Sequence, residues 1–175
     1  TLHSLLSQDY VKIDGFIAPG HVSMVIGTSP YQSIVDKYHK PFVITGFEPL
    51  DILQAIVMLV QQFVDGRCEI ENQYKRIVHS EGNLLAQQAM REVFQLKKSS
   101  EWRGLGEIEE SGVELTDAYK RFDAEVYFHS QPQQVADDPN SRCGDVLTGK
   151  CKPSDCPLFG TQCNPDNAYG ALMVS

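Results

Sequence analysis

The residues of this sequence best suited to chemistry are four cysteines, Cys143, Cys151, Cys156 and Cys163, which lie within 21 positions. Seven, four and six residues separate them. The glycines and prolines around them favour tight turns over long helices or strands. Because the segment has few large apolar side chains, it cannot organise itself by burial alone. We expect four thiolates that converge on a metal centre to hold it together.

Three kinds of thiol chemistry fit such a run of cysteines. Disulfides suit a secreted chain, but the first residues show no secretory pattern, and 175 residues are enough for a core without covalent crosslinks. Structural zinc usually draws on C-x-x-C pairs, which are absent here. An iron–sulfur cluster accepts longer and less regular spacings. The spacing therefore favours an iron–sulfur cluster over zinc, and either over disulfides.

The chain before the cysteines has the pattern of an α/β fold. Two short apolar runs, residues 14–18 and 42–45, are expected to be buried strands. The helix predicted between them starts at Ser29, and this βαβ arrangement makes the strands parallel. A second helix, apolar nearly all round, is expected from 49 to about 64, with Gly66 as its C-cap.

Weaker patterns follow. Residues 69–78 are a candidate further strand, Ser80 is expected to cap another helix, and residues 125–128 are expected to form a short strand. We therefore predict a parallel-sheet, Rossmann-like α/β fold with a small, irregular cysteine-rich iron–sulfur domain. The predicted boundaries are 1–98 for the α/β domain, 99–141 for a connecting segment with a short helix and strand, and 142–175 for the cysteine-rich domain.

Two turns after the predicted strands carry polar side chains. The turn PGHVS contains His21 and Ser23, and the turn GFEPLD contains Glu48 and Asp51. Ligands bind beyond the carboxyl ends of strands in open parallel sheets, so these four side chains are candidates for one cleft. The alternative is structural, because carboxylates in the first turn of a helix are favoured by its dipole. Neither turn matches a nucleotide-binding loop.

Composition excludes some partners. The formal net charge of −8 argues against binding to nucleic acid, which requires a cationic face. The longest apolar run, residues 55–60, is too short to span a membrane. We expect a cytoplasmic protein. Since the sequence starts at Thr1 without Met and stops after an apolar run, we also expect it to be a fragment or a processed piece.

Five motifs, in order, resemble those of the HypD family, whose members mature nickel–iron hydrogenases. They are PGHVSMVIG (19–27), GFEPLD (46–51), ENQY (71–74), SEWRGLG (100–106) and CGDVLTGKCKPSDCPLFGTQCNP (143–165). The resemblance extends from near residue 10 to the end of the chain. It implies two α/β domains and a small [4Fe-4S] domain in the family, of which this chain is similar to the C-terminal half.

The resemblance also implies partners and a role. Family members act with the chaperone HypC as a scaffold on which iron acquires its cyanide and carbon monoxide ligands, giving Fe(CN)2CO, and HypE delivers the cyanide. The iron-holding motifs CGGH and GPGCPVC are absent from this chain. Many relatives carry cysteine at the position of Leu172 and often lack one at Cys151. We therefore expect Cys151 to be the fourth cluster ligand, the alternative being a cysteine further downstream.

The sequence therefore leaves two alternative hypotheses for the function. The first is an assembly scaffold with redox function, rather than a turnover enzyme, that carries a [4Fe-4S] cluster on the four cysteines. The second is an α/β enzyme that acts on a small molecule through His21, Glu48 and Asp51 and holds a structural zinc. Metal analysis separates the two.

Overall fold

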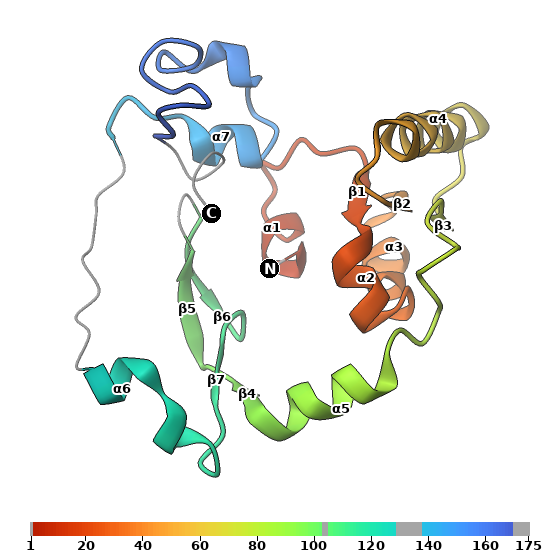
Figure 1. Ribbon diagram of the computed structural model, residues 1–175. Helices are drawn as coiled ribbons and strands as arrows, with labels where there is room; N and C mark the ends of the chain where they lie inside the picture. The colour runs from red at the N-terminus through yellow and green to blue at the C-terminus, as the bar shows by residue number, and fades with distance from the viewer. Residues whose placement is uncertain (1, 103–104, 129–137, 170–175) are drawn as a thin grey trace. The chain divides into compact units, whose positions relative to one another are not determined.

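The computed structural model describes residues 2–102, 105–128 and 138–169 (Figure 1). The chain divides into two compact units. One consists of residues 13–91, and the other combines residues 1–12 with residues 92–175. The three-part division predicted from the sequence, with its connecting segment and cysteine-rich domain, stays a prediction.

The unit of residues 13–91 is built on a parallel sheet. Its elements are β1 (Phe16–Pro19), α2 (Gly20–Ile26), the 3₁₀ helix η1 (Ser29–Tyr31), α3 (Gln32–Tyr38), β2 (Phe42–Thr45), α4 (Pro49–Asp65), β3 (Ile70–Asn72) and most of α5 (Leu84–Val93). The strands lie in the order β1-β2-β3, and both pairs are parallel. Phe42 lies opposite Phe16 on one side and opposite Ile70 on the other. The predicted α/β class and its parallel sheet are confirmed.

Strand β2 forms the centre of this unit. Phe42, Val43 and Ile44 are each at most 1% exposed, because the strand is paired on both edges and covered on both faces. The ring of Phe16 stacks on Phe42 with centroids 4.7 Å apart, and the ring of Tyr31 with centroids 5.4 Å apart. This arrangement explains why the sequence of β2 is a continuous apolar run rather than an alternating one.

Helix α4 is fixed to the sheet by a buried glutamine. Gln62 is 0% exposed; its Nε2 donates to the carbonyl of Phe42 at 3.4 Å, and its Oε1 accepts from the amide of Glu69 at 2.9 Å. The helix ends as expected at Gly66, whose φ of 65° lies in the left-handed region. Gln62 therefore connects α4 to β2 and to the segment that enters β3.

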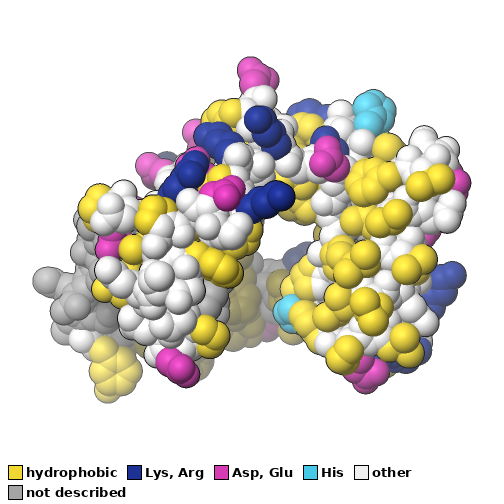
Figure 2. Space-filling model, turned by 90° about the horizontal axis from the view of Figure 1, so that it is seen from above, with side chains coloured by type: hydrophobic (Ala, Val, Ile, Leu, Met, Phe, Trp, Pro, Cys, Tyr) yellow, Lys and Arg dark blue, Asp and Glu magenta, His cyan; other side chains and the backbone are white. Residues whose placement is uncertain are grey.

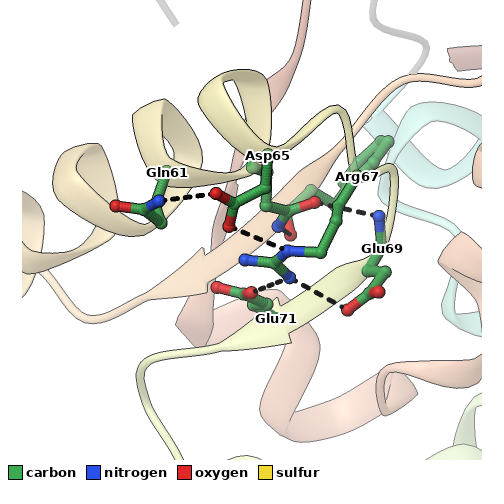
Figure 3. A network of polar contacts seen from close by, with 7 residues as sticks. Gln61, Asp65, Arg67, Glu69 and Glu71 are labelled. Atoms are coloured by element: carbon green, nitrogen blue, oxygen red, sulfur yellow. Dashed lines mark hydrogen bonds and ion pairs between the residues drawn. The ribbon is translucent and has the colours of Figure 1, made fainter.

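Beyond the cap, an ionic network connects the end of α4 to β3 (Figure 3). The guanidinium of Arg67 donates to Asp65 at 3.2 Å, to Glu69 at 3.1 Å and to Glu71 at 2.8 Å. Gln61 donates to the second carboxylate oxygen of Asp65 at 2.8 Å. These hydrogen bonds, first among them the one to Glu71, raise the pKa of Arg67. The network thus fixes the direction in which the chain leaves the helix.

Several local predictions in this unit need correction. The helix expected from Ser29 begins with the 3₁₀ turn η1, and a separate helix, α2, precedes it. The candidate strand 69–78 is reduced to β3. Ser80 does not cap α5: the side chain of Asn83 accepts the hydrogen bond from the amide of Ala86 at 3.0 Å. The carbonyl of Ser80 instead accepts from the amide of Thr28 at 3.0 Å.

The second unit contains short elements. They are α1 (Leu2–Leu6), β4 (Phe94–Leu96), β5 (Ser99–Trp102), β6 (Gly106–Glu109), β7 (Val113–Leu115), the 3₁₀ helix η2 (Lys120–Phe122), α6 (Ala124–Phe128), α7 (Cys143–Leu147) and the 3₁₀ helix η3 (Pro153–Asp155). Two antiparallel pairs form, β4 with β7 and β5 with β6. The strand predicted at 125–128 is wrong, because these residues belong to helix α6. None of the helices in the described residues is both long and apolar enough to cross a membrane.

Candidate functional site

The carboxyl ends of the three parallel strands lie at one edge of the sheet. Strands β1 and β2 end at Pro19 and Thr45, and each is followed by a glycine, Gly20 and Gly46. Strand β3 ends at Asn72 and leads into the polar run that contains Tyr74 and Arg76. We call Gly20, Gly46, Asp51, Tyr74 and Arg76 the strand-end site. In open parallel sheets this edge is where ligands bind.

Both glycines of the strand-end site are required for close packing. A Cβ atom at Gly46 would lie 2.2 Å from Oδ2 of Asp51 and 2.9 Å from the ring of Tyr74. A Cβ atom at Gly20 would lie 2.5 Å from the carbonyl oxygen of Thr45 and 2.7 Å from the same ring. The ring of Tyr74 therefore reaches the ends of both β1 and β2 only because no side chain occupies either turn.

An ion pair forms the polar part of the strand-end site. Arg76 donates from Nη2 to Oδ2 of Asp51 at 2.7 Å and from Nη1 to Oδ1 at 3.0 Å, a bidentate geometry. Gln73 donates to Oδ1 of Asp51 at 2.8 Å, and the guanidinium of Arg76 lies 4.4 Å from the ring centroid of Tyr74. The hydrogen bond from Arg76, then that from Gln73, lowers the pKa of Asp51. The same pairing raises the pKa of Arg76.

The four residues singled out from the two turns have different surroundings. Asp51 has a side chain only 6% exposed and is held by Arg76, whereas Glu48 is 78% exposed with Oε2 at 3.8 Å from Nη2 of Arg76. Ser23 is 0% exposed; its hydroxyl donates to the carbonyl of Pro19 at 2.9 Å and lies 3.0 Å from the hydroxyl of Tyr31. The structure therefore brings Glu48 and Asp51 together at Arg76 and directs Ser23 into the core.

His21 is exposed at the start of α2, and its ring lies against the ring of Phe47 with centroids 5.1 Å apart. Of the four residues singled out from the turns, His21 and Glu48 are therefore the exposed ones, and the side chain of Arg76 at the same edge is half-exposed. Sequence reasoning assigned no role to Gln73, Tyr74 or Arg76. The signal that could have found them is the polar run directly after β3, at the position where a third parallel strand ends.

The second candidate site is the cysteine-rich segment. Its backbone is a series of turns: the amide of Phe159 donates to the carbonyl of Cys156 at 3.0 Å, and the amide of Cys163 donates to the carbonyl of Leu158 at 2.8 Å. The amide of Gly160, whose φ is 70°, donates to the carbonyl of Cys163 at 2.9 Å. Cys156 and Cys163 are therefore joined by one compact turn.

Residues near the start of the chain help to fix this segment. The amide of Lys12 donates to the carbonyl of Thr148 at 2.9 Å, just after helix α7. The ammonium group of Lys150 lies 3.7 Å from the ring centroid of Tyr10. Both contacts hold the stretch between Cys143 and Cys151, so the segment gains order from partners outside its own sequence.

Arg142 supplies positive charge to the thiols. Hydrogen bonds from the backbone of Arg142 and then of Leu158 lower the pKa of Cys156, and the charge of Arg142 adds to this effect. The pKa of Arg142 is itself raised, first by its hydrogen bond with Asp145 and next by the charge of Cys151. Its Nη2 lies 3.2 Å from Oδ2 of Asp145. The environment of Cys156 thus favours its thiolate form.

All five thiols are free of disulfide bonds, and the four clustered ones are partly exposed. Cys68 is exposed, and its thiol donates to the carbonyl of His39 at 3.2 Å. Within the described ranges, no three His, Cys, Asp or Glu side chains come close enough together to hold a metal ion. Leu172, the position at which relatives often carry cysteine, lies outside the described residues.

Fold and sites together define a class: α/β proteins whose parallel strands end in glycine turns and whose chain also carries a cysteine-rich segment. Within that class the chain belongs to the HypD family. The family model described as "Hydrogenase formation hypA family" matches residues 1–175, the whole chain.

Relatives at substantial identity bear the same name. The chain is 62% identical over 175 residues to "Hydrogenase maturation factor HypD" of Escherichia coli (strain K12), a match of 100% of this chain and 47% of the relative. It is 50% identical over 165 residues to "Hydrogenase maturation factor HypD2" of Bradyrhizobium diazoefficiens, with coverages of 94% and 43%. It is 50% identical over 170 residues to the HypD protein of Cupriavidus necator, with coverages of 96% and 45%.

The chain therefore spans less than half the length of these relatives. The names of these relatives refer hydrogenase maturation to the longer proteins.

Proposed function

We propose that this chain is part of a hydrogenase maturation scaffold and that it binds a [4Fe-4S] cluster through Cys143, Cys151, Cys156 and Cys163. The observation that carries the proposal is the run of four cysteines, all free of disulfide bonds, in a chain of the HypD family. Arg142 lies directly before Cys143 in the chain, and its charge acts on both Cys151 and Cys156. A positive group in this place offsets the negative charge of four thiolates, which otherwise repel one another.

The number and chemical type of the donors support such a cluster. Four thiols are the ligand complement of a [4Fe-4S] centre, and none of them is engaged in a disulfide. The thiolates of a cubane each bind a different iron atom, so they stand further apart than the ligands of a single ion. Backbone hydrogen bonds that lower the pKa of Cys156 are also the kind of contact that tunes cluster potentials.

When bound, the cluster would supply either a structural crosslink or an electron relay toward a thiol–disulfide pair elsewhere in the protein. The residues of this chain have distinct tasks around it. Arg142 places positive charge beside the thiols, and its hydrogen bond to Asp145 keeps the guanidinium in position. The contacts of Lys12 and Lys150 hold the stretch between the first two cysteines.

In the full-length protein, we propose that this scaffold acts with HypC in assembling the Fe(CN)2CO moiety and that HypE provides the cyanide. The motifs CGGH and GPGCPVC, which hold the iron in the family, do not occur in these 175 residues. These residues alone are therefore not expected to assemble the iron centre. Their contribution would be the cluster and the strand-end site, beside which His21 and Glu48 are exposed.

The test is anaerobic reconstitution with iron and sulfide, followed by measurement of iron and acid-labile sulfide per chain. We expect four of each and a broad absorption at roughly 400 nm. Cys156→Ala should abolish this absorption. The matched control is Cys68→Ala, because Cys68 lies outside the cysteine-rich segment and should be dispensable. One zinc per chain with no iron uptake under these conditions would refute the cluster assignment.

The strand-end site is tested separately in the full-length protein. Glu48→Gln removes the accessible carboxylate near Arg76, and we expect it to lower hydrogenase maturation in cells while iron and sulfide content stay unchanged. If maturation is unaffected, the role of Glu48 is restricted to the first turn of α4. A loss of cluster in this variant would contradict the separation of the two sites.

A further inference from the structure

Helix α4 carries an apolar stripe whose repeat is that of a helix–helix seam. Five residues recur at alternating intervals of three and four positions: Leu50, Leu53, Val57, Val60 and Val64. A repeat of 3.5 residues keeps one line of side chains facing a neighbouring helix over several turns. We call these five residues the α4 stripe.

The α4 stripe faces away from the sheet. Its members are 64%, 60%, 67%, 52% and 75% exposed, in chain order. The opposite side of the helix carries Ala55 and Gln62, both 0% exposed and packed toward the strands. Figure 2 shows apolar side chains gathered over the part of the molecule where α4 lies, at the right of the view. A contiguous apolar surface of this kind marks an interaction site.

The chemistry of the surface restricts what covers it. Between residues 49 and 64 the only charged side chain is Asp51, which is buried and paired with Arg76. The positions that flank the stripe are Gln54 and Gln61 on one side and Ile56 and Phe63 on the other. With no charge on either flank, the surface fits an apolar, uncharged helix and has no group for recognising a charged peptide or an anion.

We propose that the α4 stripe is covered, in the full-length HypD protein, by an apolar helix from the part of that protein that these 175 residues do not span. The first argument is the length of the full protein relative to this chain. The Escherichia coli relative matches 100% of this chain with 47% of its own length, so more than half of its residues lie elsewhere. The stripe is about 21 Å long at 1.5 Å per residue, which a helix of about 14 residues covers.

Charge favours an occupant from the same chain over a second copy. Each copy has a formal net charge of −8, so association of two copies brings together two acidic proteins, while the stripe offers no opposite charge in compensation. A helix of the same chain is held at a high effective concentration and does not pay the cost of association. The proposal is independent of the cluster and of the strand-end site.

The test measures accessibility in the full-length protein carrying this sequence. Val57→Cys places a thiol in the middle of the stripe, and Lys37→Cys, on the exposed side of α3, is the matched control. Each variant is treated with a maleimide, the label is located by peptide mass spectrometry, and the molar mass is measured by light scattering at the same concentration. In the native monomer, we expect the thiol at position 57 to react with the maleimide at least about 10-fold more slowly than the thiol at position 37. This difference in rate should disappear in urea.

Equal rates in the native monomer would overturn the proposal, because the stripe would then be open to solvent. Protection that occurs only in a dimer and disappears on dilution would overturn it in favour of a second copy. Protection in the monomer supports it, and a crosslink from position 57 identifies the covering helix.

Discussion

A methyl group added at Gly46 should disrupt the strand-end site. The Cβ of Gly46→Ala would lie 2.2 Å from Oδ2 of Asp51 and 2.9 Å from the ring of Tyr74. Non-bonded heavy atoms pack at roughly 3.5 Å, so the carboxylate has to move by about 1 Å. That movement lengthens the hydrogen bond from Nη2 of Arg76, which is 2.7 Å in the native arrangement. The substitution therefore acts on the ion pair without changing either charged residue.

Overpacking of this kind costs about 1–3 kcal/mol in the free energy of unfolding. We expect Gly46→Ala to lower the urea midpoint accordingly, with an unchanged m-value, and to lower hydrogenase maturation in the full-length protein. The matched control is Gly66→Ala. Gly66 also precedes a chain turn, and its φ of 65° makes alanine unfavourable, but nothing lies within 4 Å of its would-be Cβ. The Gly66→Ala variant should therefore have a lower free energy of unfolding but unchanged hydrogenase maturation.

A double-mutant cycle decides whether the clash is with Asp51. In an Asp51→Ala background the carboxylate is gone, so the penalty of Gly46→Ala should fall by about 1 kcal/mol or more, leaving only the contact with Tyr74. The penalty of Gly66→Ala should be the same in both backgrounds. If Gly46→Ala costs as much without Asp51 as with it, the geometry described for the strand-end site is wrong.

Three further predictions concern the same unit. Gln62→Leu removes a buried hydrogen bond to the carbonyl of Phe42 and a part-buried one from the amide of Glu69, and should destabilise by about 2–4 kcal/mol in urea titrations. The neighbouring exposed Gln61→Leu should change stability by less than about 0.5 kcal/mol, and equal effects of the two substitutions would contradict the buried role of Gln62. Asn83→Ala should cost about 1 kcal/mol and speed amide exchange in the first turn of α5, and unchanged exchange would exclude Asn83 as the cap. Because the folded pKa of Asp51 is lowered from 3.8, its contribution to stability is complete above the unfolded pKa and is lost as pH falls through the folded pKa. Asp51→Asn should therefore flatten the acid side of the stability–pH curve, and an unaltered slope would refute the pairing.

The sequence determined the elements whose signals are local. Strand β2 and helix α4 lie within one residue of their predicted bounds, because a short apolar run between breakers, a proline at the first helical position and a glycine cap each act within a few residues. The parallel sheet followed from the spacing of the two strands. The cysteine run and the two glycine turns were likewise visible as patterns of residue type.

Elements whose signals were weak were predicted less well. Residues 125–128 have the composition of a strand but form α6, and Ser80 has the chemistry of a cap that Asn83 provides. In both places several residues nearby could satisfy the same local preference. At Ser80, contacts distant in the sequence engage its carbonyl, which accepts hydrogen bonds from residues 28 and 29. In α6 the hydrogen bonds are local, such as that from the amide of Tyr127 to the carbonyl of Asp123.

The strand-end site depended on tertiary structure. Asp51 and Arg76 are 25 residues apart, and nothing in the sequence pairs them; they meet because β2 and β3 are adjacent parallel strands whose carboxyl ends lie at the same edge. The same packing turned Ser23 from a candidate reactive group into a buried one. Residue types and their spacing along the chain thus set which chemistry is available here, whereas strand pairing set which of those groups can act together, since only pairing brings distant residues within hydrogen-bonding distance.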